Sequence, residues 1–281
     1  MRKKKNSNAF SKFDTVITYA ILIVVSFLFF FPCLWIVLAS FSKSGSIYSF
    51  DGFFPSAFSL VSFKKLFTDT AMYNYPKWFL NTFFVASGSC ILGTLLTILT
   101  AYTMSRYEFK LRKSMMKTTM ILGMFPSFMG MTAVYILMTQ FGLINRLWGL
   151  ILIYAAGAPM GYLTQKGYFD TIPKAIDEAA KIDGATNAQV FWKIHMPLSK
   201  PIITYTALTA FTWPWSDFIL PKLLLKEKNL YTVAVGLMSL DETEFVRFAA
   251  GSVFIAVPIV ILYFCLVRNM INGIAEGAVK G

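Results

Sequence analysis

The side chains best suited to recognition chemistry lie in one polar stretch, Glu178 to Pro201, which reads EAAKIDGATNAQVFWKIHMPLSKP between two hydrophobic segments. Pro173 fits the first turn of a helix, where its missing N–H is not needed. The residues after Pro173 follow helical periodicity until Gly184 interrupts it, at a point where the backbone needs conformational freedom. A second short helix is expected to end at Pro197, which cannot continue it. The pattern predicts two short helices at an angle that present small side chains to a partner protein, although it also fits an amphipathic loop on a membrane surface.

A second group of aromatic and polar side chains surrounds Pro214. Pyranose rings have apolar faces edged with hydroxyl groups, so aromatic platforms beside polar groups can bind a sugar without a charge. The proline is expected to loosen its helix there. Trp and Tyr also collect at membrane interfaces, so the same group fits an interface belt as well. The candidate substrate-path residues are Tyr205, Trp213, Trp215, Asp217 and Phe218.

Motifs for catalysis are absent from the sequence. There is no G-x-x-x-x-G-K-[ST] phosphate loop, so the chain does not bind and hydrolyse ATP by that route, and there is no nucleophile elbow or zinc-helix motif. The only histidine, His195, is expected to make a polar contact at the loop surface. Cys33, Cys90 and Cys265 fall in apolar segments, which predicts no disulfide framework. We therefore expect no enzyme activity, no cofactor and no metal site.

The elements that must position these residues are hydrophobic. The chain has 281 residues, of which 56% are hydrophobic and 14% charged, with a mean hydropathy of +0.60, as is typical of a polytopic membrane protein. A span needs about 20 apolar residues. Charge-free windows predict an all-α membrane protein with six transmembrane helices and a cytoplasmic two-helix loop at 171–201, between helices 4 and 5. The expected spans of this single domain (1–281) are about 15–39, 79–104, 118–139, 147–165, 201–220 and 248–267.

The net charge of +12 is explained by orientation in a membrane rather than by nucleic-acid binding. With both termini inside, most of the 26 Lys and Arg residues fall in inside segments, as expected for cytoplasmic loops near anionic lipid headgroups. The first apolar run, Val16 to Leu38, is too long for the core of a signal peptide, so we expect an uncleaved first helix. The first four spans and the sixth contain no ionisable residue, which disfavours a proton-coupled carrier. If the chain is a transporter, a separate subunit should therefore supply the energy for transport.

The polar stretch resembles the EAA loop of ABC-importer permeases, the segment that docks onto a cytoplasmic ATPase. The resemblance implies that this segment couples the chain to the ATPase. The matching positions are Glu178, Ala179, Ala180, Asp183, Gly184, Ala185, Phe191, Ile194, Pro197 and Pro201.

Segments further along narrow the resemblance. Residues 215–218, WSDF, look like the Trp-Asn-Glu-Phe segment of sugar permeases, although Ser216-Asp217 departs from Asn-Glu. Residues 231–237, 243–245 and 248–251 look like the last third of maltose-type permeases, and residues 277–281 are similar to the end of the shorter permease subunit of that pair. This resemblance implies a second related permease, two cytoplasmic ATPase subunits and an extracytoplasmic solute-binding protein in a bacterial cytoplasmic membrane. The implied substrate is an oligosaccharide, maltodextrin-like; galactosides, raffinose-type sugars, glycerol phosphate or a membrane scaffold or sensor without transport remain alternatives.

The resemblance also implies two further contact regions. An acidic tip flanked by apolar residues is expected to reach into the binding protein, with a solvated turn as the alternative. The C-terminal tail is expected to reach the ATPase dimer as an extended peptide, because its glycines oppose a helix; a frayed terminus is the alternative. The tip is Asp241, Glu242, Thr243 and Glu244, and the tail is Gly277, Ala278, Val279, Lys280 and Gly281.

Overall fold

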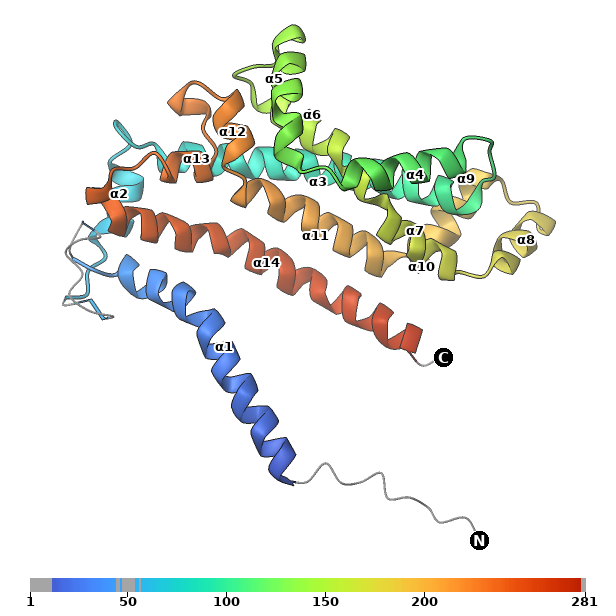
Figure 1. Cartoon of the computed structure of the whole chain (residues 1–281), viewed down its shortest axis with the longest axis horizontal. Coiled ribbons are helices and arrows are strands. Elements are labelled where there is room, and N and C mark those ends of the chain that lie inside the picture. Colours follow the sequence, from blue (N-terminus) through green and yellow to red (C-terminus); the bar gives the residue numbers. More distant parts are fainter. Residues whose placement is uncertain (1–11, 44–45, 47–53, 56, 279–281) are drawn as a thin grey trace. The chain divides into compact units, whose positions relative to one another are not determined.

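The computed structural model describes residues 12–43, 46, 54–55 and 57–278 (Figure 1). The chain divides into two compact units, one of residues 1–68 with 240–253 and one of residues 69–239 with 254–281. Within the described ranges every named element is a helix, and the one extended pairing is an isolated bridge between Ser42 and Phe58. The expectation of an all-α fold is confirmed.

The first unit contains a long apolar helix, a short helix and a helical turn. Its elements are α1 (Lys12–Ser40), α2 (Val61–Thr68), the 3₁₀ turn η6 (Glu242–Glu244) and the first residues of α14 (Phe245–Ala278). The ring centroids of Trp35 and Phe245 lie 5.5 Å apart. Arg247 is only 4% exposed, and its Nε lies 3.1 Å from Glu244 Oε2, which fixes the start of α14 to η6.

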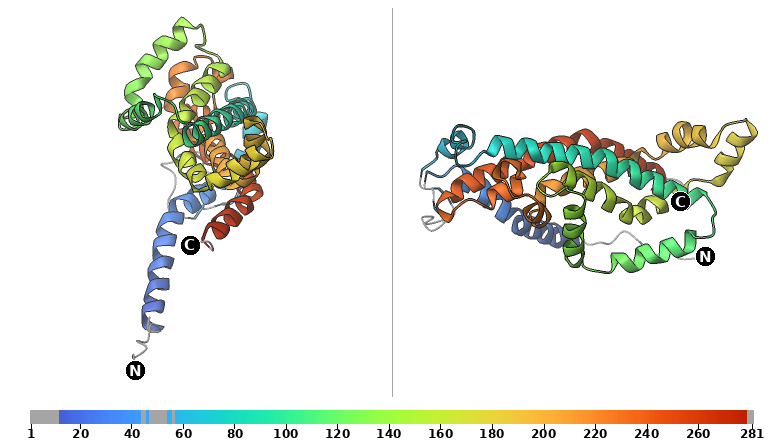
Figure 2. Two further views of the ribbon diagram at one scale, coloured as in Figure 1. Left: turned by 90° about the vertical axis from the view of Figure 1, so that its right-hand side faces the viewer. Right: turned by 90° about the horizontal axis from the view of Figure 1, so that it is seen from above.

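The second unit is built around α3 (Tyr75–Arg106), against which α6, α7 and α11 pack (Figures 1 and 2). The buried face of α3 includes Thr82, Ala86, Ser89 and Gly93. Such small side chains let neighbouring helices approach closely in a membrane. The other elements of this unit are α4 (Arg112–Gly123), η2 (Ser127–Gly130), α5 (Met131–Gln140), α6 (Leu147–Gly157), η3 (Ala158–Gly161), α7 (Tyr162–Thr171), α8 (Lys174–Ile182), α9 (Asn187–Gln189), the π-helical η4 (Val190–His195), α10 (Met196–Leu198), α11 (Lys200–Ser216), α12 (Ile219–Leu224), η5 (Lys228–Leu230) and α13 (Val233–Leu237).

The beginning of α3 holds the segment between α12 and α13. Trp78 Nε1 donates to Lys228 O at 2.8 Å, and the N–H of Val233 donates to Thr82 Oγ1 at 2.7 Å. Asn81 Nδ2 donates to the carbonyl oxygens of Asn229 and Tyr231 at 2.8 and 3.0 Å. These bonds satisfy backbone groups that burial would otherwise leave unpaired. The segment between the fifth and sixth expected spans is therefore ordered and partly helical, and it packs on α3.

Three helices are long and apolar enough to cross a bilayer within the described residues: 15–40, 75–106 and 242–267. Two bent pairs pass the same test together, 112–123 with 128–140 and 147–157 with 162–171, at angles of 96° and 45°. The chain is thus a multi-pass membrane protein with three to five such segments. α11, with 17 residues, is the further helix that six spans would require.

Three of the expected spans are interrupted: 118–139, 147–165, which bends by 45° between α6 and α7, and 201–220. Two of these breaks have a clear local cause. The window 118–139 is divided at Pro126, which has φ −58° and ψ 127°; a proline disfavours the α conformation of the residue before it. The window 201–220 ends as a helix at Ser216, because Asp217 is extended, with ψ 119°. Its Oδ1 then accepts the N–H of Ile219 at 3.1 Å and so helps to begin α12. The continuation of one helix to Leu220 is a correction to the expectation.

The last helix is longer than the window 248–267, because α14 continues to Ala278. The backbone of Gly277 and Ala278 is therefore helical rather than extended. A helix that is already formed can propagate through one glycine at a cost of about 1 kcal/mol. Val279, Lys280 and Gly281 lie outside the described residues, so the expected extended tail is wrong for its first two positions only.

Candidate functional site

The stretch expected as two angled helices turns sharply at Gly184, whose φ is +82°. The N–H of Ala185 donates to Ala180 O at 2.9 Å, and the N–H of Gly184 donates to Lys181 O at 3.0 Å. This pair of bonds is the Schellman motif, which ends a helix at a residue with positive φ. The Schellman motif at Gly184 therefore explains why α8 ends at Ile182.

The next helix begins with a capping box that the sequence reasoning missed. The N–H of Gln189 donates to Thr186 Oγ1 at 3.3 Å, and the N–H of Thr186 donates to Gln189 Oε1 at 2.8 Å. The signal was available, because Thr followed three residues later by Gln is the sequence form of this motif. Only residues 183–186 lie between the end of α8 at Ile182 and the start of α9 at Asn187, and hydrogen bonds fix both ends, so the corner has little backbone freedom.

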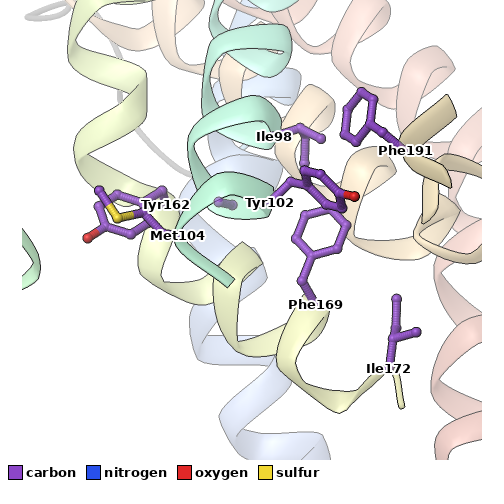
Figure 3. Close-up of a cluster of buried hydrophobic side chains, with 8 residues drawn as sticks. Ile98, Tyr102, Met104, Tyr162, Phe169, Ile172 and Phe191 are labelled. Atoms are coloured by element: carbon purple, nitrogen blue, oxygen red, sulfur yellow. The ribbon is translucent and has the colours of Figure 1, made fainter. Parts of the chain in front are cut away.

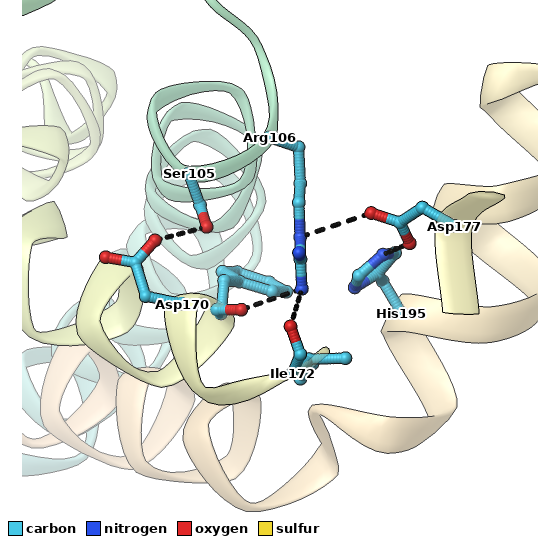
Figure 4. Close-up of polar contacts among 7 residues, drawn as sticks. Ser105, Arg106, Asp170, Ile172, Asp177 and His195 are labelled. Carbon is cyan, nitrogen blue, oxygen red and sulfur yellow. Dashed lines mark hydrogen bonds and ion pairs between the residues drawn. The ribbon is translucent and has the colours of Figure 1, made fainter. Parts of the chain in front are cut away.

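Three charged or titratable side chains fix this segment to α3 and α7 (Figure 4). Arg106, the last residue of α3, donates through Nη2 to the carbonyl oxygens of Phe169 and Ile172, both at 2.8 Å. Its Nε lies 3.5 Å from Asp177 Oδ2 on α8, and Asp177 Oδ1 lies 2.5 Å from His195 Nε2 on η4. The guanidinium of Arg106 thus pairs with the carbonyl groups at the end of α7 and with Asp177 on α8. The carboxylate of Asp177 in turn joins α8 to η4, the helices on the two sides of the corner. We call Arg106, Asp177 and His195 the anchor cluster.

The position of His195 differs from the expectation. Its side chain is fully buried (0% exposed) and faces the ring of Tyr102, with centroids 5.0 Å apart, so it is not at the loop surface. Burial, which disfavours the charged imidazolium, lowers the pKa of His195; Asp177 opposes this shift, and Arg106 adds to it. The neutral ring can donate its Nε2–H to Asp177. The sequence placed His195 in a polar stretch but gave no sign of the aromatic floor beneath it.

That floor is a hydrophobic cluster at the end of α3 (Figure 3). Phe191 is buried, with its ring centroid 4.7 Å from that of Tyr102, and Tyr102 lies 5.7 Å from Phe169. Phe191 therefore faces its own chain and anchors the segment rather than facing a partner. The buried members of the cluster are Ile98, Ala101, Tyr102, Met104, Tyr162, Phe169, Ile172 and Phe191.

The remaining residues expected to couple to the ATPase divide by exposure. Glu178, Ala179, Asp183, Gly184 and Pro197 are exposed, Ala185 and Ile194 are half-buried, and Ala180 is buried. The expectation that Ala180 faces a partner is therefore corrected: its side chain faces inward beneath the corner. Two strongly exposed apolar side chains were not among the expected contact residues: Ile182 at the end of α8 is 87% exposed, and Trp192 is 55% exposed.

Two prolines act differently from the expectation. Pro173 is the N-cap residue of α8, with ψ 133°, and not a residue of its first turn. Pro197 lies within α10, so the helix does not end there but continues to Leu198. The π-helical turn that precedes it, Val190–His195, changes the hydrogen-bond register. A proline in a regular α-helix lacks the N–H for the i−4 carbonyl and clashes with it, and a π-turn is a local adjustment of that ladder.

A cavity of about 700 Å³ opens among α3, α5, α6, α7 and α11. It is bounded by the face of α11 that carries Tyr205, Thr206, Thr209 and Trp213 at helical spacing. Its further lining residues are Ser89, Thr97, Gly130, Met131, Val134, Ile153, Tyr154, Gly157, Gly161, Thr164, Gln165, Ala210, Asp217 and Leu220.

The cavity separates the expected substrate-path residues into two groups. Tyr205, Trp213 and Asp217 line it, and the hydroxyl group of Tyr154 donates a hydrogen bond to Asp217 Oδ2 at 2.8 Å. Trp215 points elsewhere: it is 1% exposed, and its ring centroid lies 5.0 Å from that of Phe79 on α3. Phe218 is half-buried and does not line the cavity. Helical periodicity explains the different positions of Trp213 and Trp215, because residues two apart on a helix lie on different faces.

The acidic tip in the first unit is formed by Asp241 and η6. Asp241, Glu242 and Thr243 are exposed, whereas Glu244 is half-buried and pairs with Arg247. The N–H of Glu244 donates to Asp241 O at 2.9 Å, which closes the turn. The tip thus has three exposed polar positions, and its fourth stabilises the start of α14.

Residues 93–280, more than half of the chain, match the family described as binding-protein-dependent transport system inner membrane component. The sequence is 37% identical over 270 residues to the maltodextrin transport system permease protein MalD of Streptococcus pneumoniae, covering 94% of this chain and 95% of that protein. It is 36% identical to the maltodextrin transport system permease protein MdxG of Bacillus subtilis, covering 98% and 100%. It is 34% identical to the galactooligosaccharides transport system permease protein GanQ of Bacillus subtilis, covering 94% and 95%.

The fold is similar to chains of a bacterial ABC transporter involved in the import of the acidic polysaccharide alginate. One crystal structure matches with a TM-score of 0.76 at 18% identity, covering 95% of this chain and 99% of that chain. A second, of the alginate transporter in complex with a periplasmic protein bound to an alginate pentasaccharide, matches with a TM-score of 0.65 at 17% identity, covering 89% and 92%. At these identities the likeness concerns the fold alone.

Proposed function

The chain belongs to the family of binding-protein-dependent transport system inner membrane components, and we propose that it is a permease subunit of an ATP-driven oligosaccharide importer, with maltodextrin-like sugars as substrates. It forms the translocation path with a second, related permease. Two cytoplasmic ATPase subunits hydrolyse the ATP, and an extracytoplasmic solute-binding protein delivers the sugar. The names of the relatives support this class, because two refer to maltodextrin and one to galactooligosaccharides.

The proposed topology is one transmembrane domain over 1–281 with six spans and both termini in the cytoplasm. The three long apolar helices and the two bent pairs supply five spans. α11 supplies the sixth, supported by its packing along α3, which is itself long enough to cross a bilayer. In this arrangement the corner at Gly184 lies on the cytoplasmic side, and α12 and α13 lie on the outer side.

The coupling role rests on one observation: the segment has a fixed base and an exposed apolar tip. The anchor cluster and Phe191 hold its base on α3 and α7. Its tip carries Ile182, which is 87% exposed beside the corner. Figure 1 shows α8 at one end of the second unit, beyond α7 and α10. An exposed isoleucine on a rigid corner suits insertion into an apolar groove of an ATPase subunit.

A crosslinking experiment tests this role in the assembled transporter. After Cys33, Cys90 and Cys265 are replaced by serine, Ile182→Cys should crosslink to a cysteine in the ATPase groove, with a yield that changes when nucleotide is added. Met238→Cys is the matched control, because Met238 is also strongly exposed, at 60%, but lies on the proposed outer side. A transporter that hydrolyses ATP normally but gives no crosslink at 182 would contradict the docking proposal.

An uptake experiment tests the substrate class. Cells or proteoliposomes that contain the complete transporter should accumulate labelled maltotriose in an ATP-dependent way. A galactooligosaccharide is the main competitor, because one relative is named for that substrate; a raffinose-type sugar and glycerol phosphate complete the set. Preferential uptake of a competitor would reassign the sugar, whereas a chain that supports no uptake at all would favour the scaffold or sensor alternative.

Two further contacts belong to the same proposal. The exposed tip at 241–243 contacts the solute-binding protein, so replacement of 241–243 by Gly-Ser-Gly should weaken its stimulation of ATP hydrolysis while basal hydrolysis persists. Glu244 is retained in this variant because it pairs with Arg247. The tail 277–281 contacts the ATPase dimer, so its deletion should reduce stimulated hydrolysis relative to basal hydrolysis. Unchanged stimulation in the tip variant would show that 241–243 is only a connector. Unchanged stimulation after the deletion would show that 277–281 is a frayed end.

A further inference from the structure

We propose that the cavity among α3, α5, α6, α7 and α11 is a binding subsite, within this subunit itself, for an uncharged sugar residue. This inference rests on the proposed import of oligosaccharides. It goes beyond that proposal by assigning sugar contacts to particular residues of this chain and by stating which sugars the contacts exclude.

The first argument is that the cavity wall contains buried oxygens without a hydrogen-bond partner. Ser89 Oγ and Thr97 Oγ1 on α3 and Gln165 Oε1 on α7 are buried and unpaired, and all three residues line the cavity. Gln165 is only 6% exposed, and its Nε2 donates to Thr206 Oγ1 at 3.1 Å, which fixes the amide orientation and leaves the oxygen without a donor. A buried acceptor without a donor costs about 1–3 kcal/mol. These atoms have almost no solvent-accessible surface, so a small rotation of the side chains toward the cavity would be needed for them to bond to the hydroxyl groups of a sugar.

The second argument is that aromatic rings line the same cavity. Tyr205 and Trp213 lie two helical turns apart on α11, line the cavity and are 41% and 61% exposed. Their exposure means that packing within the chain does not require them. Flat aromatic faces suit the apolar faces of a pyranose ring, while the amide and hydroxyl groups suit its edge. The volume of about 700 Å³ is within the range of about 300–1,000 Å³ typical of small-molecule sites.

The third argument is charge, which excludes acidic ligands. Among the described residues that line the cavity, Asp217 is the one charged side chain, and no Lys, Arg or His is present. Both carboxylate oxygens of Asp217 already accept hydrogen bonds, from Tyr154 and from the start of α12. A phosphate or uronate would therefore meet a negative charge and no cation, and burying an unpaired charge is strongly unfavourable. The subsite should bind neutral sugars and reject acidic ones, in contrast to the cargo named for the alginate transporter.

Binding to the assembled transporter without the solute-binding protein tests this subsite directly, because the binding protein would otherwise impose its own selectivity. Maltotriose should change the fluorescence of the transporter, and Trp213→Phe should abolish most of that change. Gln165→Leu should weaken maltotriose binding by about 5- to 10-fold, the loss of one hydrogen bond. Thr206→Val should also weaken it, because Thr206 Oγ1 accepts from Gln165 Nε2 and so orients the amide oxygen. Glucuronate oligosaccharides and glycerol phosphate should give no change.

Controls separate loss of the subsite from loss of the fold. Thr212→Val makes the same chemical change on α11 outside the cavity, where the hydroxyl bonds only to Leu208 O, and should bind maltotriose like the unmodified protein. Trp213→Ala removes an exposed ring and should lower both maltotriose binding and uptake. If Trp213→Ala, Thr206→Val and Gln165→Leu all transport and bind maltotriose normally, or if an acidic sugar binds as well, the subsite is wrong although the chain is still an importer subunit. Absence of any oligosaccharide uptake by the unmodified transporter would instead overturn the proposed function.

Discussion

At the scale of single residues, Gly184 offers the clearest prediction because its constraint is purely conformational. Its φ is +82°, and a Cβ placed there would meet no atom within 4 Å. Substitution should therefore cost only the left-handed backbone, about 1–2 kcal/mol for an ordinary side chain. Gly184→Val should reduce sugar-stimulated ATP hydrolysis strongly, and Gly184→Asn should reduce it less, because asparagine tolerates this region better.

Gly142 provides the matched control for this prediction. It also has positive φ, +65°, and open space around the position of a Cβ, but it follows α5 and not the corner. Gly142→Val should lower stability to a similar extent and leave the ratio of stimulated to basal hydrolysis unchanged. Wild-type stimulation in Gly184→Val would show that the corner geometry is not needed for coupling.

His195 predicts a dependence of the docked segment on pH. Burial lowers its pKa below the ordinary value of about 6.5, so a state in which η4 is detached binds a proton more readily than the docked state. The stabilisation by the neutral, docked ring is complete above about pH 6.5 and is lost as pH falls below that value. Hydrogen exchange of 187–198 in the assembled transporter should become faster between pH 7.5 and 5.5, after correction for the intrinsic rate.

The variant His195→Gln separates titration from packing. Glutamine can still donate to Asp177 but cannot take up a proton in this range, so its corrected exchange should be flat with pH. Equal pH dependence in both proteins would mean that another group controls the segment. Asp177 and Arg106 face the same ring and are the groups to change next.

At the scale of elements, the packing of α13 on α3 depends on one glycine. A Cβ at Gly236 would collide with the ring of Trp78, and Trp78 is fully buried with its Nε1 bonded to Lys228 O. Gly236→Ala should therefore force α13 away from α3 and destabilise the protein by about 1–3 kcal/mol, the usual cost of overpacking. The melting temperature of the purified transporter measures this effect.

A glycine with space around it gives the comparison. Gly167 lies within α7 with no atom within 4 Å of a Cβ, so Gly167→Ala should leave the melting temperature unchanged or raise it, because alanine favours the helix. A melting temperature for Gly236→Ala that equals that of the unmodified protein would mean that α13 can move without cost.

The sequence predicted the elements whose signals are local. The glycine corner follows from a residue type at a helix end, and the apolar windows follow from composition. The anchor cluster could not be predicted, because Arg106 and Asp177 meet only through the fold, 71 positions apart in the sequence. The same reason explains Trp215, whose neighbour Phe79 belongs to a distant helix. The composition of the segment predicts that Trp215 lies in the membrane, but it does not predict whether its side chain faces the protein core or the cavity.

At the scale of the whole molecule, the count of spans is open to a direct test. Single cysteines at Leu111 and Ile182 should react with a membrane-impermeant thiol reagent from the cytoplasmic side. Cysteines at Phe141 and Lys226 should react from the outer side. All four positions are exposed within the chain, so side and not burial should decide the labelling. Reaction of positions 182 and 226 from the same side would show that α11 does not cross the membrane and that six spans are wrong.

The length of α3 has a mechanical consequence. Its 32 residues span about 48 Å at 1.5 Å per residue, its only proline is in the first turn, and it is held by Trp78, Asn81 and Thr82 at one end and by Arg106 at the other. A rod of this length that tilts by about 5° displaces its far end by about 4 Å. Movement of residues 228–233, which pack on the first turns of α3, would thus be transmitted to the corner at Gly184 near its other end, because α3 does not bend between the two. Spin labels at Lys77 and Tyr107 should keep one separation through the transport cycle, whereas a change of that separation would show that α3 flexes and that the two ends move independently.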